Sequence, residues 1–247
     1  MSRPHNGSAT AAEFPWDQVQ QLDYQDANTG SIAQACHAMI FAKTEAKFVS
    51  QLPCKAWVLM QMRFDGKLGF PGGVVSDQAI PDTTLEDGLN REMEEELALD
   101  MSRFAFSKKH YVVSHFCPKA NLILNFYAQE VTEQEFKEIE GNALRAEEYG
   151  HECLGIVRIP LFTLQDGHNG LPVFLQNQFA GTSILQVIVG LCTHNLMKPD
   201  ELNTAMAVLP RHQGYRRLVH QAVASFRDRQ QTIRVPDLPE NRAVAHK

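Results

Sequence analysis

Short apolar runs alternate with longer amphipathic stretches through the middle of the chain. Five runs have the length and the β-branched or aromatic content of strands, at residues 36–42, 56–62, 111–115, 122–129 and 152–159. In three further stretches apolar residues recur at helical spacing, at residues 85–97, 133–149 and 183–196. Because strands and helices interleave along the chain, the pattern predicts an α/β fold in which helices cover a mixed β-sheet.

The two ends of the chain differ from this middle part. Residues 1–33 are rich in small and polar residues, which is typical of a flexible arm. Near the other end, an amphipathic helix is expected over residues 215–226, and residues 230–247 have the composition of a polar tail. The sequence therefore predicts a folded domain over residues 34–197, between that arm and a helical C-terminal extension with a polar tail over residues 198–247.

The composition excludes several classes of protein. With 44% hydrophobic and 21% charged residues, the 247-residue chain has enough apolar material for a sizeable core. The longest apolar stretch, residues 184–192, is far shorter than the ~20 residues of a membrane helix, so we expect no membrane contact. The start of the chain lacks the apolar segment of a secretory signal, which indicates the cytosol or nucleus. Five cysteines without a C-x-x-C pair argue against a disulfide framework and a zinc ribbon.

The helix expected over residues 85–97 has a clear start and a clear inward side. Thr84, followed three residues later by Asp87, fits a capping box. At about 100° per residue, one apolar ridge faces the core. Its members are Leu85, Leu89, Met93 and Leu97. Glu92 and Glu96 fall on the same side as this ridge, whereas Glu94 points to solvent.

An acidic run such as residues 94–96 is most often a solvated helix face. Here the carboxylates stand at spacings where like charges repel, and their burial costs several kcal/mol unless a positive charge compensates. A hard divalent cation is the natural compensation, and Arg91 offers a further charge-assisted bond. Gly72 and Gly73 let the backbone come close to a ligand and offer a carbonyl to the same ion. Taken alone, this glycine pair is equally compatible with a turn that closes a strand.

The segment REMEEEL at residues 91–97 resembles the core of the Nudix box, the signature of metal-dependent hydrolases of nucleoside diphosphates linked to other groups. More narrowly, RFDGKLGFPGG, LEDGLNRE, CLGIVRIPL and GLPVFLQNQF look like the branch of that family that removes caps from small nucleolar RNA and hydrolyses inosine diphosphate. The resemblance covers about residues 36–191 and implies an α/β/α sandwich with a mixed β-sheet. Two departures stand out: the loop before the box is longer than usual, and Ala98 replaces the customary glycine.

The resemblance assigns roles to individual residues. It implies Mg²⁺ or Mn²⁺ as cofactor, held by Gly72, Glu92, Glu95, Glu96 and Glu152. The catalytic residues that it implies are Glu95, Glu96 and Glu152, with either Glu95 or Glu152 as the general base. The residues that it places at the nucleotide are His37, Arg63, Phe70, His115 and Gln186. A lone histidine in a strand is more often structural, so His37 and His115 carry the weakest of these assignments.

Two substrates fit the resemblance, namely (deoxy)inosine-type nucleoside diphosphates and the 5′ cap of an RNA. The net charge of −6 does not favour RNA binding, although residues 211–234 contain six arginines. Those arginines either contact phosphates or form the solvated side of the amphipathic helix. The resemblance further implies a homodimer, located in the nucleolus, nucleoplasm and cytoplasm. The alternative is a non-catalytic RNA- or protein-binding module on the same fold, which would be expected to lose the glutamate cluster.

Overall fold

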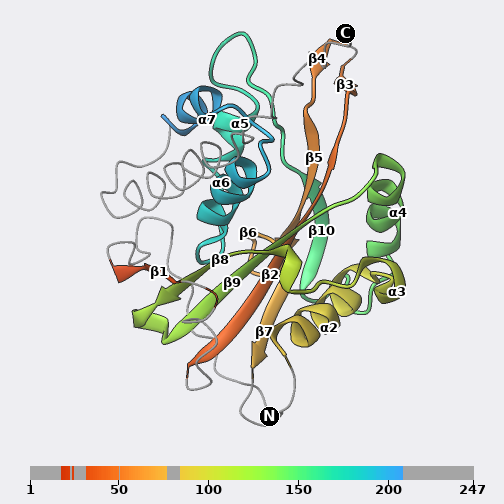
Figure 1. The fold of residues 1–247 in the computed structure, drawn as a ribbon. Coiled ribbons are helices and arrows are strands. Elements are labelled where there is room, and N and C mark those ends of the chain that lie inside the picture. The colour runs from red at the N-terminus through yellow and green to blue at the C-terminus, as the bar shows by residue number, and fades with distance from the viewer. Residues whose placement is uncertain (1–17, 23, 25–31, 50, 77–83, 208–247) are drawn as a thin grey trace, which may run out of the picture.

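The computed structural model describes residues 18–22, 24, 32–49, 51–76 and 84–207 (Figure 1). Their main sheet has the strand order β1-β8-β9-β2-β5-β10. These strands span Gln20–Leu22, Tyr111–Cys117, Leu122–Glu130, Ala33–Lys43, Ala56–Arg63 and Cys153–Arg158. β2 and β9 run parallel, and the other neighbours in the sheet run antiparallel.

The described part of the chain has four further, short strands. β6 (Leu68–Gly69) pairs with β5, and β7 (Gly72–Ser76) pairs with β2. β3 (Lys47–Phe48) and β4 (Leu52–Pro53) form a separate two-stranded ribbon. Single 3-10 turns, η2 and η3, flank β8 at Lys108–His110 and Pro118–Ala120.

Helices cover both faces of the main sheet, as Figure 1 shows. On one face lie α5 (Leu171–Phe174), α6 (Ser183–Thr193) and α7 (Pro199–Met206). On the other lie α2 (Leu85–Leu97), α3 (Met101–Phe104) and α4 (Glu133–Ala143). Because both faces are covered, successive residues of β2 are buried in opposite cores, and the strand is an almost continuous apolar run. The predicted α/β/α sandwich with a mixed sheet is confirmed.

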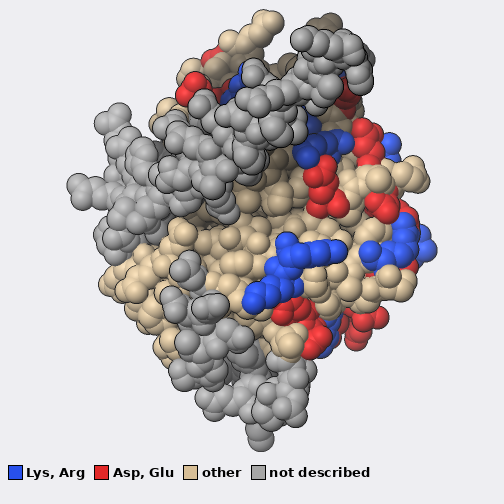
Figure 2. Space-filling model, in the orientation of Figure 1, with Lys and Arg blue, Asp and Glu red and all other residues tan. Residues whose placement is uncertain are grey.

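Many of the charged side chains on the face drawn in Figure 2 lie on its right side, where Figure 1 places α2 and α4, and others lie near the centre and at the upper end. On these two helices the apolar ridge is buried and most acidic and basic residues face outward, with Glu96 of α2 as a buried exception. None of the described helices is long and apolar enough to span a bilayer.

Most of the expected elements are present, with shifted ends. α2 has the predicted bounds, but α4 ends at Ala143 rather than at residue 149. Beyond α4 the backbone turns away, and the Glu148 N–H bonds to the Glu95 carbonyl at 3.0 Å. This tertiary hydrogen bond holds the chain in a turn, although the apolar residues after Ala143 continue at helical spacing.

Parts of both predicted ends pack on the sheet. β1, within the predicted arm, pairs with β8, and Val19 before it is buried. In the predicted extension, α7 buries Leu202 and Ala205 in the core beside α6. The helix expected over residues 215–226, the polar tail and the arginine-rich segment lie outside the described residues.

Candidate active site

α2 brings acidic side chains to the sheet as its sequence pattern predicts. The helix begins after Thr84, whose hydroxyl accepts from the Asp87 N–H while the Asp87 carboxylate accepts from the Thr84 N–H, so the capping box is confirmed. The predicted apolar ridge is buried. Glu96 is buried with that ridge at 4% exposure, whereas Glu94 is exposed.

Two glycines of β7 allow the strand to lie close to β2 and to the carboxylates of α2. Gly72 has φ +126°, and a Cβ there would lie 2.1 Å from the Cys36 carbonyl oxygen of β2. A Cβ on Gly73 would lie 2.5 Å from Glu92 Oε2. The Gly72 N–H donates to Glu96 Oε2 at 2.7 Å. Any larger residue at either position would push into β2 or into the carboxylates of α2, so the pair does more than close a strand.

The acidic cluster consists of Glu92, Glu95 and Glu96 of α2 together with Glu152. Its negative charge exceeds the positive charge of the side chains around it. Arg91 donates to Glu92 Oε1 and Glu95 Oε2, each at 2.5 Å, as expected of a buttressing arginine. Burial raises the pKa of Glu96 to about 8, the Gly72 N–H opposes this, and the charges of Glu92 and Glu152 add to it. Burial likewise raises the pKa of Glu92, against the effect of Arg91. These carboxylates are therefore close enough to repel one another.

This donor set fits a divalent cation. Carboxylate oxygens are hard ligands, and a cation among them would offset the burial, and then the repulsion from Glu92 and Glu152, that raise the pKa of Glu96. Among the described residues, no three His, Cys, Asp or Glu side chains already stand in a ligating arrangement. Arg91 contacts one oxygen each of Glu92 and Glu95, so the second oxygen of each carboxylate is not bound by the arginine.

Glu152 reaches the cluster from a different part of the chain. It ends the turn that follows α4, and its carbonyl accepts from the Phe64 N–H at 2.9 Å, just past β5. The bond from the Glu148 N–H to the Glu95 carbonyl fixes the same turn to α2. Glu152 thereby lines the candidate pocket beside Gly72 and Gly73.

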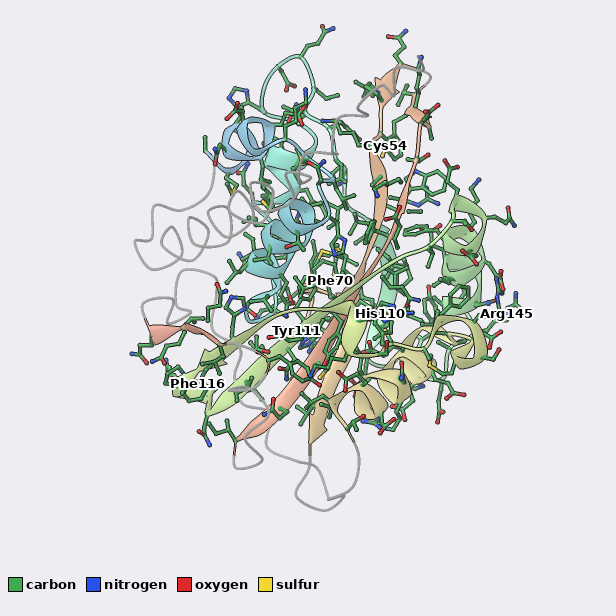
Figure 3. All side chains as sticks on the ribbon, viewed as in Figure 1. Cys54, Phe70, His110, Tyr111, Phe116 and Arg145 are labelled. Carbon is green, nitrogen blue, oxygen red and sulfur yellow. The ribbon has the colours of Figure 1, made fainter. Side chains whose placement is uncertain are left out.

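The pocket itself has a volume of about 330 Å³, within the range of small-molecule sites. Four of the five residues expected at the nucleotide line it, namely His37, Arg63, Phe70 and Gln186. Its apolar walls come from Ala35, Val74, Leu122 and Leu124. Phe70 packs on Phe126 with ring centroids 5.2 Å apart and lies at the centre of Figure 3, near α6.

Several polar atoms of the pocket residues are buried and have no hydrogen-bond partner among the described residues. They are His37 Nδ1, Arg63 Nε, Thr182 Oγ1 and Gln186 Oε1. A buried polar group without a partner costs about 1–3 kcal/mol, so such groups in a pocket indicate a ligand that completes their bonds. Burial and then the Arg63 charge lower the pKa of His37 to about 4, which keeps its ring neutral at physiological pH.

Arg63 is held by its surroundings. Its Nε lies 3.5 Å from Asp65 Oδ1, and its guanidinium stands 5.4 Å from the Phe64 ring centroid. A Cβ on Gly69 would lie 2.9 Å from Arg63 Cδ, so the arginine stem packs directly on β6. A cation in this place suits a phosphate oxygen.

His115 is the predicted nucleotide residue that lies outside the lining. It is buried in β8, opposite Leu124, which does line the pocket. Because directly opposed residues of an antiparallel pair share a face, its side chain lies on the pocket side of the sheet. Burial lowers its pKa to about 4.

Sequence reasoning missed Thr182. It lines the pocket one helical turn before Gln186, at the start of α6, and its hydroxyl makes no capping bond. Its spacing of four from Gln186 was the available signal, since residues four apart share one side of a helix.

Comparison with protein families finds a match over residues 34–197 to the family described as "Nudt16-like: U8 snoRNA-decapping enzyme-like". The chain is 44% identical to the U8 snoRNA-decapping enzyme of Mus musculus over 67% of its length and 83% of the relative. It is 48% identical to the protein of that name from Homalodisca vitripennis, over 58% of this chain and 74% of the relative. It is also 34% identical to the Tudor-interacting repair regulator protein of Gallus gallus, over 87% of this chain and 68% of the relative.

The comparison with solved structures finds two bacterial proteins among its matches. A mutT/nudix family protein from Listeria innocua has a TM-score of 0.40 at 14% identity and covers 67% of this chain and 98% of its own. A MutT/nudix family protein from Enterococcus faecalis has a TM-score of 0.41 at 14% identity and covers 81% of each chain.

Proposed function

Because the chain belongs to the Nudt16-like family of Nudix hydrolases, we propose that it cleaves a pyrophosphate bond in an inosine-type nucleoside diphosphate or in the 5′ cap of an RNA. One observation carries this proposal. Glu152 lines a pocket in which buried polar atoms have no hydrogen-bond partner among the described residues, and Glu92 and Glu96 lie directly behind Gly73 and Gly72 of its wall. Family membership alone would not distinguish a catalytic site from a fold that has lost catalysis. The carboxylates beside this pocket favour a catalytic site.

Nudix hydrolases generally need divalent metal ions, and Mg²⁺ or Mn²⁺ is the expected cofactor here. We assign the ligands to Glu92, Glu96 and Glu152, with Glu95 and Gly72 as further candidates. When bound, the cation supplies charge neutralisation for the phosphate oxygens and lowers the pKa of an attacking water.

The side chains of the pocket bind and orient the substrate. Arg63 donates to a phosphate oxygen, and Phe70 provides an aromatic surface beside the base. Gln186 and Thr182 form hydrogen bonds with the edge of the base. A carboxylate, either Glu95 or Glu152, accepts the proton of the attacking water.

The products depend on the substrate. Hydrolysis of a nucleoside diphosphate gives a nucleoside monophosphate and phosphate. Hydrolysis of a capped RNA gives the cap nucleoside as its diphosphate and a 5′-monophosphate RNA. Relatives named as snoRNA-decapping enzymes support a capped RNA as partner and a nuclear role. Nucleolus, nucleoplasm and cytoplasm are the compartments that we propose. A homodimer remains part of the proposal.

A second function has a specific observation in its favour. The relatives at 34–36% identity include proteins named Tudor-interacting repair regulator, so a protein-binding role on this fold is the alternative. The complete carboxylate cluster of this chain favours hydrolysis over binding alone.

Product release from inosine diphosphate and from a capped RNA, measured side by side with Mg²⁺, with Mn²⁺ and with a chelator, tests the proposal. Turnover of either substrate that the chelator abolishes supports a metal-dependent hydrolase, and the ratio of the rates identifies the preferred substrate. If the folded protein binds Mn²⁺ and turns over neither, the binding function replaces the hydrolase.

A further inference from the structure

The first turn of α2 carries a carboxylate that two tyrosines hold from different parts of the chain. Glu86 Oε1 accepts from the hydroxyl of Tyr127 at 2.9 Å and from that of Tyr24 at 3.1 Å. Tyr127 belongs to β9 and is fully buried. Tyr24 follows β1, outside residues 34–197 that match the family. One oxygen therefore joins the helix of the candidate active site to the central sheet and to the N-terminal segment.

Further contacts fix Tyr24 in this place. Its ring lies 4.8 Å from the Tyr111 ring in an edge arrangement, and Lys108 Nζ stands 4.2 Å from its centroid. β1, just before it, pairs with β8, with Leu22 opposite Ser114 (Figure 1). Tyr111, labelled in Figure 3, also packs edge-on against Tyr127 at 5.7 Å. The three tyrosines thus form one aromatic cluster beside Glu86.

The tyrosine hydroxyls remain donors over the physiological pH range. Burial, and then the bond to Glu86, raise the pKa of Tyr24 to about 12. Burial raises the pKa of Tyr127 further. Hydrogen bonds to a carboxylate are stronger than those between neutral groups, so the pair is a firm attachment for α2.

The position of α2 affects the site because the next turns of the helix pack directly against β7. A Cβ on Gly88 would lie 2.4 Å from Val75 Cβ, so helix and strand are in direct contact. One and two turns later, Glu92 rests against Gly73 and Glu96 accepts from Gly72. A small shift or rotation at the start of α2 therefore moves both carboxylates relative to the pocket.

We propose that Tyr24 and Tyr127 are positioning residues for the candidate active site, acting through Glu86 on the carboxylates of α2. β1 and Tyr24 are then part of the frame that sets the geometry of those carboxylates. The inference rests on the proposed function for its kinetic consequences, and on the contacts above for the arrangement.

Tyr24→Phe and Tyr127→Phe test it, because each removes one hydroxyl and keeps the ring. Tyr111→Phe is the matched control, since its hydroxyl donates to Ser114 and not to Glu86. We expect kcat for inosine diphosphate to fall about tenfold in each test variant, with KM nearly unchanged, and to stay at the wild-type value in the control. In a Glu86→Ala background Tyr24→Phe should have no further effect, because both changes remove the same bond.

Mn²⁺ affinity, measured by calorimetry, provides a readout that needs no turnover. We expect Tyr24→Phe and Tyr127→Phe to weaken Mn²⁺ binding about threefold or more, and Tyr111→Phe to leave it unchanged. An inactive wild type that shows this pattern would refute the hydrolase and support positioning. Equal kcat and Mn²⁺ affinity in all three variants would overturn the positioning role, as would equal loss in test and control variants.

Discussion

Replacing Gly73 with alanine tests how closely β7 holds the carboxylates of α2. An added Cβ would lie 2.5 Å from Glu92 Oε2, and separations below 3.0 Å essentially never occur for real Cβ atoms. The carboxylate must therefore retreat by at least about 0.5 Å, the difference between those distances. Misplacement of about 1 Å can cost a hundredfold in rate, so we expect kcat to fall about 10- to 100-fold.

The neighbouring glycine provides the contrast. The backbone of Gly73 lies outside the left-handed region, and the side chain that it would displace is flexible, so Gly73→Ala should change the free energy of unfolding by less than about 1 kcal/mol. Gly72→Ala places a Cβ 2.1 Å from a backbone oxygen at φ +126° and should lose more than about 3 kcal/mol. Turnover of inosine diphosphate and urea unfolding measure the two effects. Wild-type kcat in Gly73→Ala, or equal destabilisation by both variants, would refute this account of the carboxylates.

Three further predictions concern single side chains. Ala98 ends α2 in the left-handed region, at φ 49°, so Ala98→Gly should raise the urea-unfolding free energy by about 1 kcal/mol; a decrease would contradict the strain. Thr182→Val removes a buried hydroxyl that bonds to none of the described residues, so it should raise KM for inosine diphosphate about tenfold without loss of stability; an unchanged KM would exclude contact with substrate. Burial lowers the pKa of His115 from 6.5 to about 4, so between these pH values the unfolded chain binds a proton that the folded protein does not. The free energy of unfolding should therefore be highest above pH 6.5 and fall by up to roughly 3 kcal/mol as the pH falls to 4. Urea unfolding between pH 4 and 7 should show a flatter profile for His115→Gln, and parallel profiles would contradict the shift.

The features of α2 were predictable from sequence because they are local. Its cap, its apolar ridge and the burial of Glu96 depend on residues within a few turns of one another. The strand β7 was not predicted, because its glycines read as a turn. Their reason lies in tertiary contacts with Cys36 and Glu92, which are distant in sequence.

Contacts between distant segments explain the other differences. The hydrogen bond from Tyr24 to Glu86 joins the domain to a segment whose composition predicts a flexible arm. No local sequence pattern predicts this contact. α4 ends early because the turn after it bonds to α2. For Thr182, the spacing from Gln186 was visible, but its missing hydrogen-bond partner is a property of the packed pocket.

If α2 supplies the ligands for metal-dependent hydrolysis, its buried carboxylate Glu96 is essential for turnover. The most direct measurement is turnover of inosine diphosphate and capped RNA by Glu96→Gln and Glu94→Gln, with urea unfolding of both. The two variants make the same chemical change on one helix, but Glu96 is buried in the site and Glu94 is exposed to solvent. The account predicts loss of about a hundredfold or more in kcat for Glu96→Gln, with an intact fold, and wild-type turnover for Glu94→Gln. Full activity of Glu96→Gln, or equal loss in both variants, would contradict it.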